Sequence, residues 1–154
     1  MSFGIEFIGP KTLRAGHRYD FISTMDGLLD LARAIGTGNV GLLLDAYHLY
    51  TSGGSIDDLD GISAADVVRV HVNDAIAGVP RDEQQDQVRD LPMAQGVIDL
   101  PAFLRKLDRL GYDGPVTVEP FNKRLNELAA RDPEAAARET AASLDRAWVA
   151  AGLG

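Results

Sequence analysis

The feature that most constrains the fold is the recurrence of four short apolar segments separated by segments with a helical repeat. The apolar segments span residues 3–8, 40–44, 67–72 and 115–119. Each is apolar and ends in polar or glycine-rich sequence, which is typical of parallel strands covered on both faces. We therefore expect four buried strands that belong to one sheet.

Three of the remaining segments carry apolar residues on one face of a helix. These residues are Leu28, Leu31, Ala32 and Ile35, then Leu100, Phe103, Leu104 and Leu107, and finally Ala137, Ala141, Leu144 and Trp148. Gly36 and Gly111 are suitable C-terminal stops, and Asp99 is a suitable N-cap. The last helix is expected to begin near Asp132, and residues 56–65 have room only for a short helix or turn.

Strands that alternate with helices predict right-handed crossovers and a parallel sheet. A complete eight-stranded barrel needs about 250 residues, whereas this chain has 154. The predicted fold is therefore α/β, half of a TIM barrel, with about four parallel strands and flanking helices in a single domain over residues 1–154. The stretch from 75 to 95 lacks periodicity, and a loop of that length is usually functional or mobile.

The amino-acid composition limits which groups could bind a metal and which partners are expected. The chain has no cysteine, which excludes disulfides and thiolate ligands and leaves His, Asp, Glu or water to hold any metal. The net charge is −8 and the basic residues are scattered, so a nucleic-acid partner is disfavoured. No apolar run reaches the roughly 20 residues of a membrane span, and no signal peptide is recognisable. A cytoplasmic location is the default expectation.

Each predicted strand carries a metal-capable side chain at or near its C-terminal end: Glu6, Asp45, His71 and Glu119. A polar residue in such a place is, taken alone, more often a helix cap or a loop anchor. A carboxylate inside an apolar run is harder to explain, because an unpaired buried charge is costly. Since parallel strands bring their C-terminal ends to one face, the four positions together predict one site.

Three carboxylates and one imidazole suit a divalent cation, with Mn²⁺ as the first choice and Mg²⁺, Co²⁺ or Zn²⁺ as alternatives. A mostly oxygen shell favours polarisation of a carbonyl, and two of the carboxylates could exchange protons with the neighbouring carbon.

Further polar residues have two interpretations each. His48 follows Asp45 by three residues and either contacts a substrate hydroxyl or is an ordinary loop histidine. Arg81, in the long loop, could reach a substrate oxygen, although a single exposed arginine is usually only solvated. Asn73 and Asp74 are expected mainly to shape the turn after the third strand.

Five motifs, in this order, resemble the xylose-isomerase-like TIM-barrel superfamily. They are Gly-Ile-Glu-Phe-Ile-Gly-Pro around Glu6, Leu-Leu-Leu-Asp-Ala-Tyr-His around Asp45, Val-His-Val-Asn-Asp-Ala around His71, Gly-Val-Ile-Asp-Leu-Pro-Ala-Phe-Leu from Gly96, and Val-Thr-Val-Glu-Pro around Glu119. The sugar phosphate isomerase/epimerase group, with its ketose 3-epimerases and inosose-type dehydratases, is the most similar branch. The resemblance covers nearly the whole chain and corresponds to strands five to eight.

This resemblance implies metal ligands at Glu6, Asp45, His71 and Glu119, with the two glutamates as the acid/base pair. It also implies that His48 and Arg81 contact substrate. Two departures are visible. Gln95 stands where relatives often have Glu, and strands one to four are absent, which leaves two open sheet edges. We therefore expect a homo-oligomer or a partner half-barrel.

The resemblance implies a divalent-metal-dependent isomerase or epimerase acting on a sugar or polyol, with proton transfer next to a carbonyl/hydroxyl pair held by the metal. A metal-dependent dehydratase of the same superfamily is the nearest alternative. A non-catalytic fragment or subunit that needs a partner to complete the barrel is another. An endonuclease-type phosphodiesterase is disfavoured, because that branch uses extra histidines and this chain has 3 in total.

Overall fold

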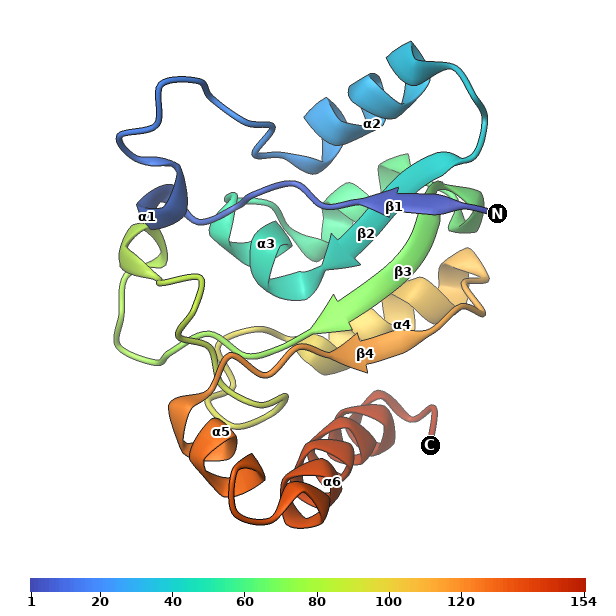
Figure 1. Cartoon of the computed structure of the whole chain (residues 1–154). Coiled ribbons are helices and arrows are strands. Elements are labelled where there is room, and N and C mark those ends of the chain that lie inside the picture. The colour runs from blue at the N-terminus through green and yellow to red at the C-terminus, as the bar shows by residue number, and fades with distance from the viewer.

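Four strands form one parallel sheet in the computed structural model, which describes residues 1–154 (Figure 1). They are β1 (Phe3–Ile5), β2 (Val40–Asp45), β3 (Val67–Val72) and β4 (Val116–Val118). The strands are paired in chain order, β1-β2-β3-β4, and each neighbouring pair is parallel. The predicted half-barrel fold is confirmed. The two edge strands are shorter than expected, so Glu6 and Glu119 lie just beyond the paired residues.

The helices are α1 (Lys11–Arg14), α2 (Met25–Ile35), α3 (Ala46–Thr51), α4 (Leu100–Leu110), α5 (Lys123–Ala129) and α6 (Pro133–Ala151), with 3₁₀ turns at Ile56–Gly61, Ala64–Asp66 and Arg81–Glu83. The three predicted helices, α2, α4 and α6, are confirmed. Asp99 and Asp132 cap α4 and α6, and Gly36 and Gly111 end α2 and α4 in the left-handed conformation. None of the helices is long and apolar enough to cross a membrane.

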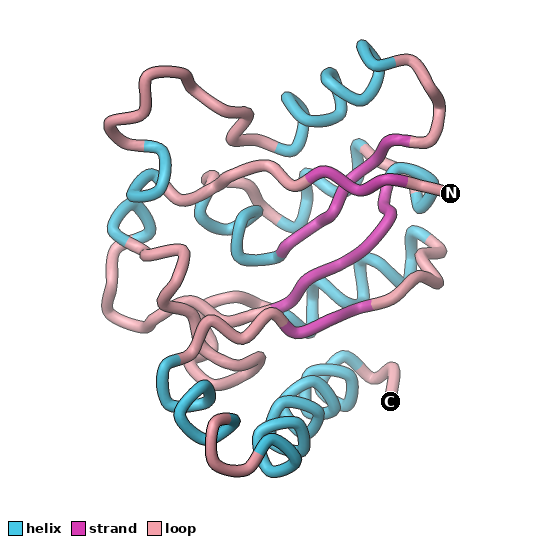
Figure 2. The backbone as a smooth tube through the Cα atoms, in the orientation of Figure 1, coloured by secondary structure: helices cyan, strands magenta, loops and turns pink.

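Sequence analysis missed α1, α3 and α5, which contain 4, 6 and 7 residues. A helix shorter than about two turns shows too few apolar positions for its repeat to be recognised. These short helices and the loops beside them lie at the end of the sheet where the strand arrows point (Figures 1 and 2). They therefore surround the C-terminal ends of the strands.

The core lies between one face of the sheet and the helices behind it (Figure 1). Leu42 and Leu44 of β2 and Val70 and Val72 of β3 are completely buried there. The register places Leu43 opposite Arg69 and Asp45 opposite His71 on the other face, where Leu43 is only half-buried and Arg69 is exposed. No helix covers that second face, which corresponds to the interior of a complete barrel.

The loop after β3 is fastened at its base by Asp74, which is completely buried. Its carboxylate accepts hydrogen bonds from the backbone N–H groups of Gln95, Gly96, Val97 and Ile98 at 2.6–3.1 Å. The expectation that Asp74 shapes the turn after this strand is confirmed. Within the loop, the buried Gln84 side chain donates to the carbonyls of Ile76 and Val79, so much of this long segment is internally braced.

Candidate metal centre

The four predicted ligands converge at the C-terminal end of the sheet. Asp45 is the last residue of β2, His71 is the penultimate residue of β3, and Glu6 and Glu119 directly follow β1 and β4. One potential ligand atom from each residue lies within 4.8 Å of those from the other three. The fold thus brings together side chains separated by more than 100 positions in the sequence.

Two of these ligand atoms lack any protein partner. Glu6 Oε1 and His71 Nδ1 are both buried, and neither forms a hydrogen bond. The carboxylate closest to His71 Nδ1 is that of Glu119, with Oε2 at 3.7 Å. Because buried polar atoms are rarely left unpartnered, these two atoms and the carboxylate-rich donor set fit a divalent cation among the four side chains.

Asp45 caps α3 and also faces the candidate metal site. Its Oδ1 accepts from the backbone N–H of Tyr47 at 2.7 Å and so caps α3, while Oδ2 faces the other site residues. The side chain is completely buried. The cap therefore fixes the carboxylate in the orientation that a ligand requires.

The segment after Glu6 approaches α3 closely at Gly9. A Cβ at Gly9 would lie 2.2 Å from the His48 carbonyl oxygen and 2.4 Å from Thr51 Oγ1, so no larger residue fits without backbone movement. The Gly9 N–H donates to His48 Nδ1 at 3.0 Å. Nδ1 is therefore the acceptor in this contact.

His48 Nε2 points toward the site, 3.8 Å from Glu6 Oε2 and 3.5 Å from Asp86 Oδ1. The ring is 2% exposed, and burial lowers the pKa of His48. Nε2 is therefore the ring nitrogen of His48 that faces the candidate ligands. His48 thus lies beside the four candidate ligands, and its contact with substrate stays a prediction.

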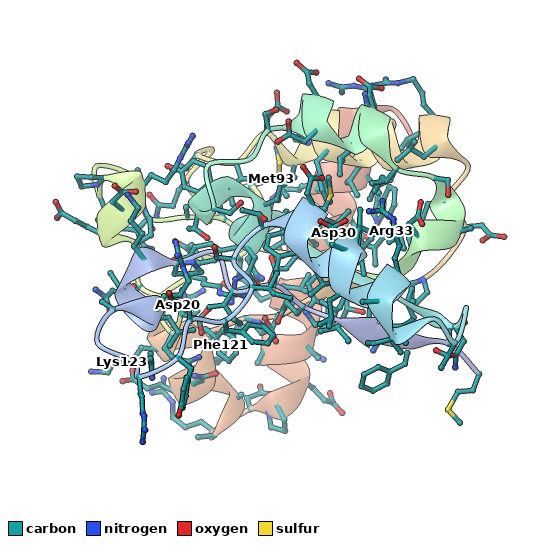
Figure 3. All side chains as sticks on the ribbon, turned by 90° about the horizontal axis from the view of Figure 1, so that it is seen from above. Asp20, Asp30, Arg33, Met93, Phe121 and Lys123 are labelled. Carbon is teal, nitrogen blue, oxygen red and sulfur yellow. The ribbon has the colours of Figure 1, made fainter.

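Arg89 is the site residue that sequence analysis missed. Its Nη1 donates to Asp45 Oδ2 at 2.6 Å and to Glu119 Oε2 at 2.9 Å, and its Nη2 lies 3.1 Å from His48 Nε2. The guanidinium is 4.9 Å from the ring of Phe121, which is labelled in Figure 3. Arg89 lies in an aperiodic loop, and no sequence pattern distinguished it from Arg81.

Arg81 is not brought into this cluster. Its guanidinium lies 4.9 Å from the centre of the Tyr50 ring, the residue is exposed, and it forms no ion pair with any of the four predicted ligands. Its contact with substrate stays a prediction.

The two glutamates differ in electrostatics. Burial, together with the nearby Asp45 and Glu119 carboxylates, raises the pKa of Glu6 from 4.5 to about 7. The adjacent His71 and then Arg89 hold the pKa of Glu119 below its usual value, and Glu119 in turn raises the pKa of His71. Glu6 is therefore much more easily protonated than Glu119 in the metal-free site.

Residues 2–147 match the family described as xylose isomerase-like TIM barrel. The chain belongs to this family. It is 29% identical over 140 residues to an inosose isomerase of Bacillus velezensis, an alignment that covers 91% of this chain and 47% of the relative. It is also 29% identical over 116 residues to a 3-dehydroshikimate dehydratase of Pseudomonas aeruginosa, covering 75% of this chain and 18% of that enzyme.

Solved structures show the same half-length relationship. A xylose isomerase domain protein from Alicyclobacillus acidocaldarius superimposes with a TM-score of 0.82 at 35% identity, covering 99% of this chain and 52% of the other. The IolI protein with a bound zinc atom gives a TM-score of 0.74 at 26% identity, covering 92% and 48%. The chain thus spans about half the length of the inosose isomerase and of these two structures.

Proposed function

We propose that this chain is the metal-binding half of a divalent-metal-dependent isomerase or epimerase that acts on a sugar or polyol. The observation that carries the proposal is the convergence of Glu6, Asp45, His71 and Glu119 within 4.8 Å, with two buried ligand atoms that have no partner. The inosose isomerase relatives support the isomerase class, and the zinc atom in IolI supports a divalent ion.

The four side chains would hold one divalent cation, and Mn²⁺ is the proposed ion, with Mg²⁺, Co²⁺ or Zn²⁺ as alternatives. When bound, such an ion supplies Lewis acidity, which polarises a neighbouring carbonyl and acidifies the C–H bond next to it.

Glu6 and Glu119 are the proposed acid/base pair. They follow the edge strands β1 and β4, with β2 and β3 between them, so they flank the site from two sides. Proton removal on one side of a carbon and return on the other inverts that carbon, which is what epimerisation requires. If the proton is instead returned to the former carbonyl carbon, the reaction interconverts an aldose and a ketose.

Two side chains from the surrounding segments complete the proposal. His48 would contact a substrate oxygen through Nε2, the ring nitrogen that faces the site, because Nδ1 already accepts from Gly9. Arg81 stays the proposed loop arginine that contacts substrate, since the guanidinium of Arg89 already donates to Asp45, Glu119 and Asp86.

Dehydration is the second candidate, favoured by the 3-dehydroshikimate dehydratase relative. The same glutamates could remove a proton next to the carbonyl and deliver one to a hydroxyl that leaves from the adjacent carbon as water. A third candidate is a non-catalytic subunit. The chain spans about half the length of its inosose isomerase relative, and another half-barrel or a second copy would have to cover the open face.

Solvent hydrogen exchange tests the catalytic proposal. The Mn²⁺-loaded chain is incubated in D₂O with ketoses and cyclic keto-polyols, and deuterium uptake next to the carbonyl is followed by NMR. Glu119→Gln should reduce the exchange rate by at least about 100-fold while leaving the circular dichroism spectrum unchanged. Glu127→Gln, on the exposed side of α5, should exchange like the wild type.

A fully active Glu119→Gln variant would contradict the mechanism. A wild-type chain that binds Mn²⁺ but catalyses no exchange, alone or after a half-barrel partner is added, would instead favour the non-catalytic candidate.

A further inference from the structure

Arg89 is held in place by contacts that do not involve the metal ligands. Its backbone N–H donates to the Phe121 carbonyl, and its Nε donates to the Asp86 carbonyl at 2.9 Å. The guanidinium lies 4.5 Å from the centre of the Tyr47 ring and 4.9 Å from that of Phe121. The side chain is 1% exposed, so it has little freedom to leave the site.

The guanidinium connects two strands that are not neighbours. Asp45 ends β2 and Glu119 follows β4, with β3 between them. One nitrogen, Nη1, donates to both carboxylates and so bridges the strand that carries His71. Arg89 therefore fixes the separation of two predicted metal ligands, one on each side of a third.

Arg89 is also the only arginine or lysine paired with the site's carboxylates. It forms ion pairs with Asp45, Glu119 and Asp86, and no lysine or other arginine forms an ion pair with these residues or with Glu6. Asp45 is completely buried. Without a metal, loss of Arg89 would leave that carboxylate desolvated with no counter-charge, which is strongly destabilising.

We propose that Arg89 is the built-in counter-ion of the metal centre: it holds Asp45 and Glu119 in position in the metal-free protein and opposes the charge of the metal that shares those carboxylates. The inference rests on the proposed metal site. It makes Arg89 a positioning residue with two opposite effects, because it stabilises the metal-free site and repels the bound ion at short range.

The first experiment measures thermal unfolding without metal, in the presence of a chelator. Arg89→Met should lower the Tm by about 5–10 °C, because it leaves the buried Asp45 charge unpaired. Adding Asp45→Asn to that variant should restore most of the loss. Arg81→Met, an arginine of the same loop with no carboxylate contact, is the matched control and should change the Tm little.

If Arg89 acts only through its packing between Tyr47 and Phe121, the double variant will recover nothing, and that result would overturn the proposal. If Arg89→Met does not fold, a folded double variant supports the counter-ion role, and an unfolded double variant contradicts it.

The second experiment measures Mn²⁺ affinity by titration calorimetry. Removal of the opposing charge should make Arg89→Met bind Mn²⁺ about tenfold more tightly than the wild type, while Arg89→Lys and Arg81→Met remain close to it. Equal or weaker binding by Arg89→Met would contradict the charge opposition. A wild-type chain that binds no Mn²⁺ would contradict the proposed function, whereas the metal-free Tm comparison would still decide the role of Arg89.

Discussion

The ionised Glu6 side chain destabilises the metal-free protein. The side chain is 24% exposed and faces two other carboxylates, which together with burial raise its pKa from 4.5 to about 7. A carboxyl group with a raised folded-state pKa favours folding most when it is protonated. Its contribution is therefore fully present below about pH 4.5 and is lost as the pH rises through about 7.

Glu6→Gln should consequently stabilise the metal-free chain at pH 8 and have little effect near pH 4. The gain at pH 8 is on the order of 3 kcal/mol, because one pKa unit corresponds to about 1.4 kcal/mol. Urea unfolding at the two pH values, with a chelator present, measures it. A variant that is no more stable than the wild type at pH 8 would show that the ionised Glu6 carries no such penalty.

The convergence of the four candidate ligands was predictable because each occupies a strand end. Glu6, Asp45, His71 and Glu119 stand at or just after apolar runs, and parallel strands bring such positions together without further information. Arg89 was not predictable in this way. Its position depends on how the loop after β3 folds back on β4, and no periodicity in residues 75–95 indicates that path.

At the scale of elements, the loop after β3 is ordered by one buried carboxylate. Asp74 accepts from four consecutive backbone N–H groups, those of residues 95–98, at the far end of the loop. The loop returns to its starting point through these bonds, and the segment between them carries Asp86 and Arg89. By closing this loop, Asp74 also helps to position Asp86 and Arg89 at the site.

Asp74→Ala should lower the free energy of unfolding by at least about 3 kcal/mol, because several buried N–H groups lose their acceptor. It should also accelerate protease cleavage within residues 75–95. Asp82→Ala is the control, since the exposed Asp82 in the same loop pairs only with Lys11, and it should cost less than about 1 kcal/mol. Equal stability of the two variants would contradict the anchoring role.

The long helices could be predicted at this scale, whereas the short ones could not. The predicted stops of α2 and α4 and the predicted caps of α4 and α6 identify those helix ends. The predicted apolar face is correct for α4, whereas Ile35 of α2 and Ala137 and Ala141 of α6 are exposed, and α6 packs through Ala136, Ser143 and Ala147 instead. By contrast, α3 has only 6 residues, and it forms because the fold presents Asp45 as its cap. Tertiary contacts therefore decide the short elements that surround the site.

At the scale of the whole molecule, one face of the sheet is without cover. Leu43 is half-buried and Arg69 is exposed on it. Both sheet edges also present unpaired backbone groups, which favour association with another chain. The sequence predicted these open edges from the absence of four strands, but not which surface would cover them.

The purified chain should therefore associate as its concentration rises, as measured by light scattering with size-exclusion chromatography. Leu43→Lys, on the uncovered face, should weaken that association, whereas Ile35→Lys, on the exposed side of α2, should not. A compact monomer over the whole concentration range would show that the open face does not drive self-association.

We propose that four side chains, one from each strand or the residue after it, form one divalent-metal site. A crystal structure of the chain with Mn²⁺, with the ion located by its anomalous scattering, tests this most directly. The expected result is a single ion in contact with Glu6, Asp45, His71 and Glu119 at about 2.0–2.5 Å. An ion bound elsewhere, or none at saturating Mn²⁺ while the four side chains keep their present arrangement, would contradict it.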